Sequence, residues 1–82
     1  MKYILTLYFG KYDVWLRLED GRHALIKTVY GDKHNLVYNT KEIYSGATDA
    51  CWYASESFMI KNFVAESEDP QELYDLVAIE VL

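Results

Sequence analysis

Apolar and polar side chains alternate along the first twenty residues of the chain. Residues 2–9 (KYILTLYF) and residues 12–19 (YDVWLRLE) both follow this period of two, which is typical of β-strands. In the second segment, aliphatic residues stand opposite Trp15, Arg17 and Glu19, so the pattern predicts a strand with one solvent-facing side.

Turn residues separate these strands from the segments that follow. Asp20 and Gly21 tolerate positive φ and favour a tight hairpin turn, after which residues 22–30 (RHALIKTVY) return as a third strand. Residues 31–35 (GDKHN) indicate another turn, and residues 36–40 can form a short fourth strand. The first half therefore predicts an antiparallel meander that needs a cover on its apolar face.

A helical period follows over roughly residues 46–63. Small and apolar side chains recur on one side of this segment at the spacing of an α-helix, namely Ala47, Cys51, Ala54 and Phe58. Ser45 can cap the first turn, and Asp49 suits the positive end of the helix dipole. The segment is therefore expected to lie across the sheet as an amphipathic helix.

The chain ends in an acidic stretch and a second apolar segment. Residues 65–72 contain the single proline and predict a loop, whereas residues 73–82 alternate and predict an interior strand. The expected fold is α+β, an antiparallel sheet of four or five strands with one helix packed on one face, in the order ββ(β)βαβ. At 82 residues, we expect a single compact domain over residues 1–82.

Charge is unevenly distributed along the chain. Residues 1–41 hold seven Lys or Arg and four Asp or Glu, whereas residues 42–82 hold Lys61 alone against nine acids. An acidic protein is a poor ligand for nucleic-acid phosphates, so direct nucleic-acid binding is not expected. Complementary fields instead favour a basic protein as partner.

Chemical candidates are few. Cys51 could act as a nucleophile with His23 or His34 as base, yet its place on the inner stripe of the helix equally suits a small buried side chain. The spacing of the histidines predicts neither a metal site nor a cofactor. A single cysteine favours a reducing, cytoplasmic setting, and no segment has the length of a membrane span. No motif identifies an enzyme, so a non-enzymatic protein is expected.

The outer face of the predicted helix carries an unusual combination of residues. Asp49, Tyr53, Glu56 and Ile60 fall within about 40° of one another on a helical wheel, opposite the inner stripe. An aromatic and an aliphatic side chain framed by acids is what an interface anchor with a charged rim would look like. Isolated apolar residues are also common on surfaces, so both interpretations stay open.

The acidic stretch could extend this surface. It contains Glu66, Glu68, Asp69 and Glu72 within seven residues. These carboxylates either form a solvated loop or, with Glu56, present spaced negative charges to a groove built for phosphates. In the second interpretation they contribute to partner binding.

A small, acidic domain with eight tyrosines and no catalytic motif resembles phage-encoded inhibitors of host defence, anti-CRISPR proteins among them. The resemblance is one of size and composition. It implies that the acidic surface occludes a nucleic-acid site on a larger, basic effector in the host cytoplasm. The function expected is therefore that of a non-catalytic inhibitor or modulator.

Two alternatives of other classes remain. One is a homo-oligomeric binder of a small ligand or nucleotide, with a pocket between subunits lined by tyrosines and by Arg17, Arg22 and Lys27. A homodimer could form through an edge strand or through the outer helix face. The other alternative is the enzyme that depends on Cys51.

Overall fold

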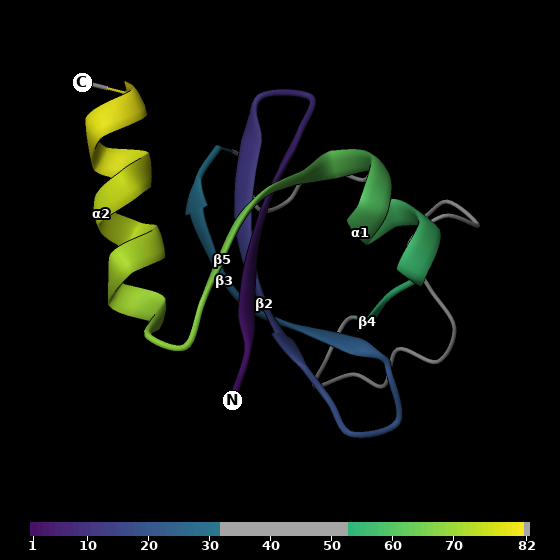
Figure 1. Ribbon diagram of the computed structural model, residues 1–82. Coiled ribbons are helices and arrows are strands. Elements are labelled where there is room, and N and C mark those ends of the chain that lie inside the picture. Colours follow the sequence, from purple (N-terminus) through teal and green to yellow (C-terminus); the bar gives the residue numbers. More distant parts are fainter. Residues whose placement is uncertain (32–52, 82) are drawn as a thin grey trace.

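The computed structural model describes residues 1–31 and 53–81 (Figure 1). Five antiparallel strands form one sheet in the order β4-β3-β2-β1-β5. Their bounds are β1 Tyr3–Tyr8, β2 Lys11–Arg17, β3 His23–Tyr30, β4 Tyr53–Ala54 and β5 Phe63–Ser67. The predicted α+β class and the three N-terminal strands are confirmed, whereas the possible strand at residues 36–40 lies outside the described residues.

Two tight turns join the first three strands. Phe9 and Gly10 connect β1 to β2 with φ angles of 48° and 75°, the positive values of a two-residue hairpin turn. Between β2 and β3, the amide of Gly21 donates to the carbonyl of Leu18 at 3.0 Å, and Gly21 has a φ of 89°. The hairpin turn expected at Asp20 and Gly21 is confirmed.

The sheet is covered on both faces. Figure 1 shows α1 (Glu56–Asn62) and α2 (Pro70–Val81) on opposite sides of it. Two separate clusters of buried side chains result, one under each helix, with Ile4, Trp15, Ala54, Phe58 and Met59 on the α1 side and Leu5, Val14, Leu73 and Val77 on the α2 side. The expectation of a single helix on one face is therefore incomplete.

Strand β2 consequently lacks the solvent-facing side that its pattern suggested. Trp15 is fully buried and packs its ring edge-on against Phe58, with the ring centroids 5.9 Å apart. Arg17 and Glu19, farther along the same segment, are exposed. The solvent-facing position predicted for Trp15 is therefore wrong, because no feature of the β2 sequence indicates that a helix covers this residue.

The helix expected over residues 46–63 is shorter in the described part of the chain. Tyr53 and Ala54 form β4, which pairs with β3 at the sheet edge, and α1 begins only at Glu56. Ser55 caps it, because its hydroxyl oxygen accepts a hydrogen bond from the amide of Phe58 at 3.2 Å. The predicted cap at Ser45 and the first turn of that helix lie outside the described residues.

The C-terminal elements differ most from the prediction. Residues expected to form a loop instead provide β5 and the start of α2, and the segment expected to be a strand forms α2. Asp69 caps α2, since its carboxylate accepts from the amide of Gln71 at 3.0 Å, and Pro70 occupies the first helical position, where its missing N–H is harmless. The order ββ(β)βαβ therefore holds through β5, and α2 follows as a second helix.

Helix α2 buries only a narrow stripe. Leu73 and Val77, one turn apart, face the sheet, whereas Ile79 is 74% exposed.

None of the helices in residues 1–31 and 53–81 has the length and hydropathy needed to cross a membrane.

Candidate functional site

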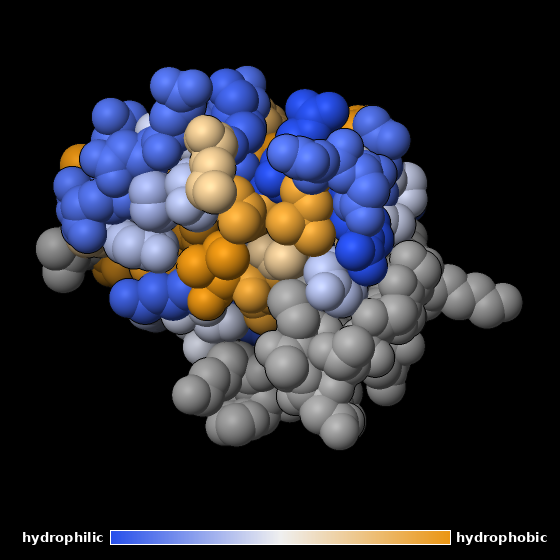
Figure 2. Space-filling view, turned by 90° about the horizontal axis from the view of Figure 1, so that it is seen from below, coloured by the Kyte–Doolittle hydropathy of each residue, from blue (hydrophilic) through white to orange (hydrophobic). Residues whose placement is uncertain are grey.

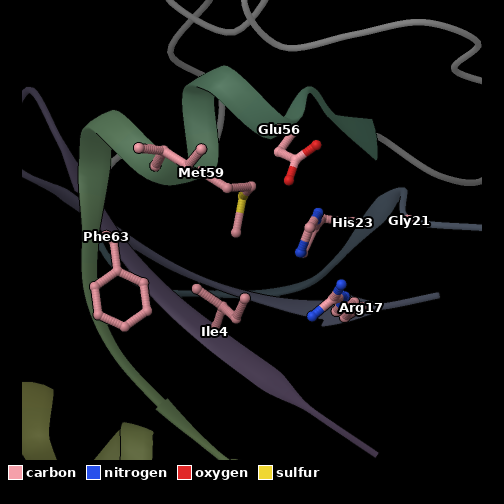
Figure 3. Close-up of a pocket in the computed structure, with 8 residues that line it drawn as sticks. Ile4, Arg17, Gly21, His23, Glu56, Met59 and Phe63 are labelled. Carbon is pink, nitrogen blue, oxygen red and sulfur yellow. The ribbon is translucent and has the colours of Figure 1, made fainter. Parts of the chain in front are cut away.

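A pocket of about 430 Å³ lies between α1 and the sheet (Figure 3). Ile4, Met59 and Phe63 form an apolar side of the pocket. Across from them, Figure 3 shows the side chains of Arg17, His23 and Glu56 close to one another. A mostly apolar recess with a few convergent polar groups is the usual form of a small-molecule site.

The strand order brings these polar groups together. Arg17 at the end of β2 is the register partner of His23 at the start of β3. His23 in turn pairs with Ala54 of β4, and α1 begins two residues later at Glu56. Three segments that are distant in the sequence therefore meet at one corner of the sheet.

The apolar side is built by β1, α1 and β5. Ile4 of β1 pairs with Glu66 of β5, and Phe63 at the start of β5 pairs with Thr6 on the same face of the sheet. One extra residue, Val64, lies between these two pairs and forms a β-bulge. The bulge keeps Phe63 on the α1 face, where the side chain is 49% exposed.

His23 is the most unusual group in the pocket. His23 is only 5% exposed, and its Nδ1 atom is buried without a hydrogen bond. Burial lowers the pKa of His23 below its usual 6.5, the positive charge of Arg17 lowers it further, and the carboxylate of Glu56 raises it. The imidazole is therefore neutral near pH 7, with a ring nitrogen that lacks a partner.

A second buried polar group lies farther along the same sheet face. Asp13 is fully buried, accepts a hydrogen bond from the hydroxyl of Thr28 at 2.6 Å, and lies 3.9 Å from the Nζ of Lys11. Burial raises the pKa of Asp13, while the hydrogen bond from Thr28 and the charge of Lys11 lower it. Lys11 is itself 2% exposed, so this ion pair is part of the interior.

The predicted outer helix face is only partly formed. Glu56 and Ile60 are exposed on α1, as expected, and Ile60 is 73% exposed. Tyr53 does not belong to this face, because it lies on β4 and is half-buried beneath the guanidinium of Arg22, which is 4.5 Å from the ring centroid. Asp49 lies outside the described residues.

The acidic residues predicted to bind a partner between positions 66 and 72 are all exposed, and the structure gives several of them a local role. Glu66 on β5 forms an ion pair with Lys2 at 3.7 Å. Asp69 caps α2, and Glu72 accepts a hydrogen bond from the hydroxyl of Ser67 at 2.9 Å. Glu68 lies in the turn between β5 and α2. The expected loop is thus a strand end and a helix start.

The other chemical candidates are only partly within the described residues. Cys51 and His34 lie outside them, so the structure does not test a nucleophile paired with a histidine. Across residues 1–31 and 53–81, no three His, Cys, Asp or Glu side chains gather closely enough to hold a metal ion.

The basic residues suggested for a ligand pocket between subunits are not together. Only Arg17 lines the pocket, whereas Lys27 lies over the ring of Tyr74 on the α2 side, with its Nζ 4.7 Å from the centroid. Arg22 is paired with Asp20 at 2.7 Å. The local pattern does not indicate that Phe63 and His23 line one pocket, because strand order brings these two residues to it.

Apolar side chains also reach the surface near hydrophilic ones. On the face drawn in Figure 2, hydrophobic side chains gather in one patch bordered by hydrophilic residues.

Comparisons with protein families, with curated proteins and with solved structures found no match to this chain.

Proposed function

We propose that the protein is a non-catalytic binding protein whose acidic edge occludes a basic, nucleic-acid-handling surface of a larger protein. The acidic edge comprises the exposed carboxylates of β5, of the following turn and of the first turns of α2: Glu66, Glu68, Asp69, Glu72 and Asp75. The observation that carries the proposal is the uniform sign of this edge, since residues 66–75 contain five acids and neither lysine nor arginine.

Little in the described part of the chain neutralises this edge. The ion pair between Lys2 and Glu66 is the one that involves these carboxylates among residues 1–31 and 53–81, and both side chains remain substantially exposed. A negatively charged surface attracts a positively charged surface and repels another negatively charged one.

The edge also has a geometry that suits association. β5 is the outer strand of the sheet, so the backbone groups on its far side make no sheet hydrogen bonds to another described strand. An exposed edge strand can accept a further strand from a partner, while its charges discourage pairing with a second acidic copy. The charges therefore favour a basic partner over self-association, and the open edge offers that partner backbone groups to pair with.

The experiment is affinity capture of a partner on the immobilised protein, followed by binding measurements with the purified partner. We expect a basic protein whose affinity falls steeply with added salt and which a short nucleic-acid duplex displaces. A partner whose binding is unchanged by an excess of the duplex would contradict occlusion of a nucleic-acid site.

Matched charge reversals locate the interface. The double variant Glu68→Lys with Asp75→Lys should weaken binding at least about tenfold. The control, Glu19→Lys with Glu80→Lys, makes the same change in net charge at exposed sites outside the acidic edge and should leave affinity nearly unchanged. Equal losses in both would show that only net charge matters, and the proposed edge would be abandoned.

A further inference from the structure

The pocket beneath α1 is separate from the acidic edge in its chemistry. Its polar side carries one cation and one anion, Arg17 and Glu56, and neither is within 4 Å of an opposite charge in the described part of the chain. Unpaired charges of both signs at one side of a recess can each form a hydrogen bond with a ligand, the guanidinium as donor and the carboxylate as acceptor. Such a ligand needs an acceptor for Arg17 and a donor for Glu56.

Between these charges lies the imidazole of His23, as Figure 3 shows. Its Nδ1 is buried and has no hydrogen bond, which is an unfavourable state for a polar atom. Three polar groups thus line one side of the pocket as a donor, an imidazole and an acceptor. A ligand with hydrogen-bonding atoms along a single edge would engage the two exposed charged groups, Arg17 and Glu56, across the imidazole that lies between them.

The opposite side selects an apolar body. Met59 and Ile4 are buried, whereas the ring of Phe63 is half-exposed at the pocket and available for stacking. An amphipathic anion such as a fatty acid would place its carboxylate near Glu56, and an amphipathic amine would meet Arg17. A flat, uncharged ring avoids both repulsions and still offers a face to Phe63.

We propose that this pocket binds a purine base or nucleoside. A purine edge presents acceptors such as O6 and N7, which suit arginine, beside amino or imino donors, which suit a carboxylate. A pocket of about 430 Å³ is within the size range of small-molecule sites and accommodates a two-ring base. The net charge of −5 disfavours ligands that carry phosphate groups. A base or nucleoside is therefore a better ligand than a nucleotide or a nucleic acid.

The test is a titration of the isotope-labelled protein with guanosine and with adenosine, followed by amide NMR shifts. We expect saturable shifts confined to residues around the pocket, including Gly21, His23 and Glu56. L-phenylalanine and octanoate serve as comparison ligands for an apolar zwitterion and an amphipathic anion. The absence of saturable shifts with both nucleosides, or tighter binding of either comparison ligand, would overturn the proposal.

Two variants assign the polar contacts. Arg17→Gln and Glu56→Gln change exposed side chains and should each weaken nucleoside binding about tenfold or more. The controls Lys27→Gln and Glu80→Gln make the same chemical changes away from the pocket and should bind like the unmodified protein. The amide spectrum reports folding in every sample, so full affinity in a folded Glu56→Gln variant would refute the assigned contact.

Discussion

The indole N–H of Trp15 donates a hydrogen bond to the hydroxyl oxygen of Thr6 at 2.8 Å, diagonally across the pairing of β2 with β1. Both residues are fully buried beneath α1. A tryptophan in an apolar core places its polar N–H where water cannot reach, so the threonine hydroxyl serves as an acceptor within the sheet.

Replacing Thr6 with valine keeps the shape of the side chain and removes this acceptor. We expect Thr6→Val to lower the free energy of unfolding by about 1–3 kcal/mol, the usual effect of removing a partner from a buried polar group. Urea denaturation followed by tryptophan fluorescence measures the change. Thr6→Ser keeps the hydroxyl and should retain the hydrogen bond, so a smaller effect of valine than of serine would contradict the assigned role.

Thr28 should stabilise the ionised form of Asp13. Its hydroxyl donates to the buried carboxylate at 2.6 Å, so Thr28→Val should cost about 1–3 kcal/mol near neutral pH. Because burial raises the pKa of Asp13, that carboxyl contributes stability at low pH that is lost as pH rises through its folded pKa. The variant raises this pKa further, and the loss of stability should shrink when Asp13 is protonated.

Urea midpoints measured from acid to neutral pH in both proteins test the coupling. Asp13→Asn cannot titrate and supplies the control, since Thr28→Val in that background should show no pH-dependent difference. A constant difference between Thr28→Val and the unmodified protein at every pH would show that Asp13 is not involved.

Acidification should destabilise the fold through His23. Burial and Arg17 lower the folded pKa of His23 below 6.5, so the unfolded chain binds the proton more readily. The stability that His23 contributes is fully present above its pKa in the unfolded chain, and it is lost as pH falls from there through its lower folded pKa. Urea midpoints at about pH 7.5 and about pH 5.5 should therefore differ more for the unmodified protein than for His23→Gln, and equal differences would refute the assignment.

The first hairpin contains a strained residue. Phe9 has a φ of 48° and is 76% exposed, although its ring packs edge-on against Tyr8 at 4.6 Å. Asparagine adopts positive φ more readily than phenylalanine. Phe9→Asn should therefore raise the free energy of unfolding, measured by urea denaturation, by about 0.5–1 kcal/mol despite the lost ring contact. Gly10→Ala, at a φ of 75°, should have the opposite sign.

Asp69 and its neighbour separate structural from binding roles. Asp69→Ala removes the cap of α2 and should cost about 1 kcal/mol of stability, whereas Glu68→Ala should change stability little. Thermal unfolding with helix content measured by circular dichroism distinguishes the two. If both variants unfold alike, the cap contributes nothing and Asp69 is free to act in binding alone.

Local signals sufficed for the first thirty residues. Alternation and the glycines at turns specify antiparallel hairpins because each strand lies beside its neighbour in sequence. They failed at the C-terminus because Val77, Ile79 and Val81 alternate like a strand, while the pair Leu73 and Val77 fits a helix equally well. The signal that distinguishes the two is Asp69 before a proline, a pair that begins a helix here although it is also common in loops.

The candidate pocket shows what tertiary structure alone decided. Sequence pattern identified Glu56 and Ile60 as outward-facing, and composition identified the acidic segment around Glu68. The meeting of Arg17, His23 and Glu56 depends on β4 pairing with β3, a contact between segments some thirty residues apart. Local periodicity shows which way a side chain faces, whereas strand order and the second helix decide what lies opposite it, and that determined both the burial of Trp15 and the pocket.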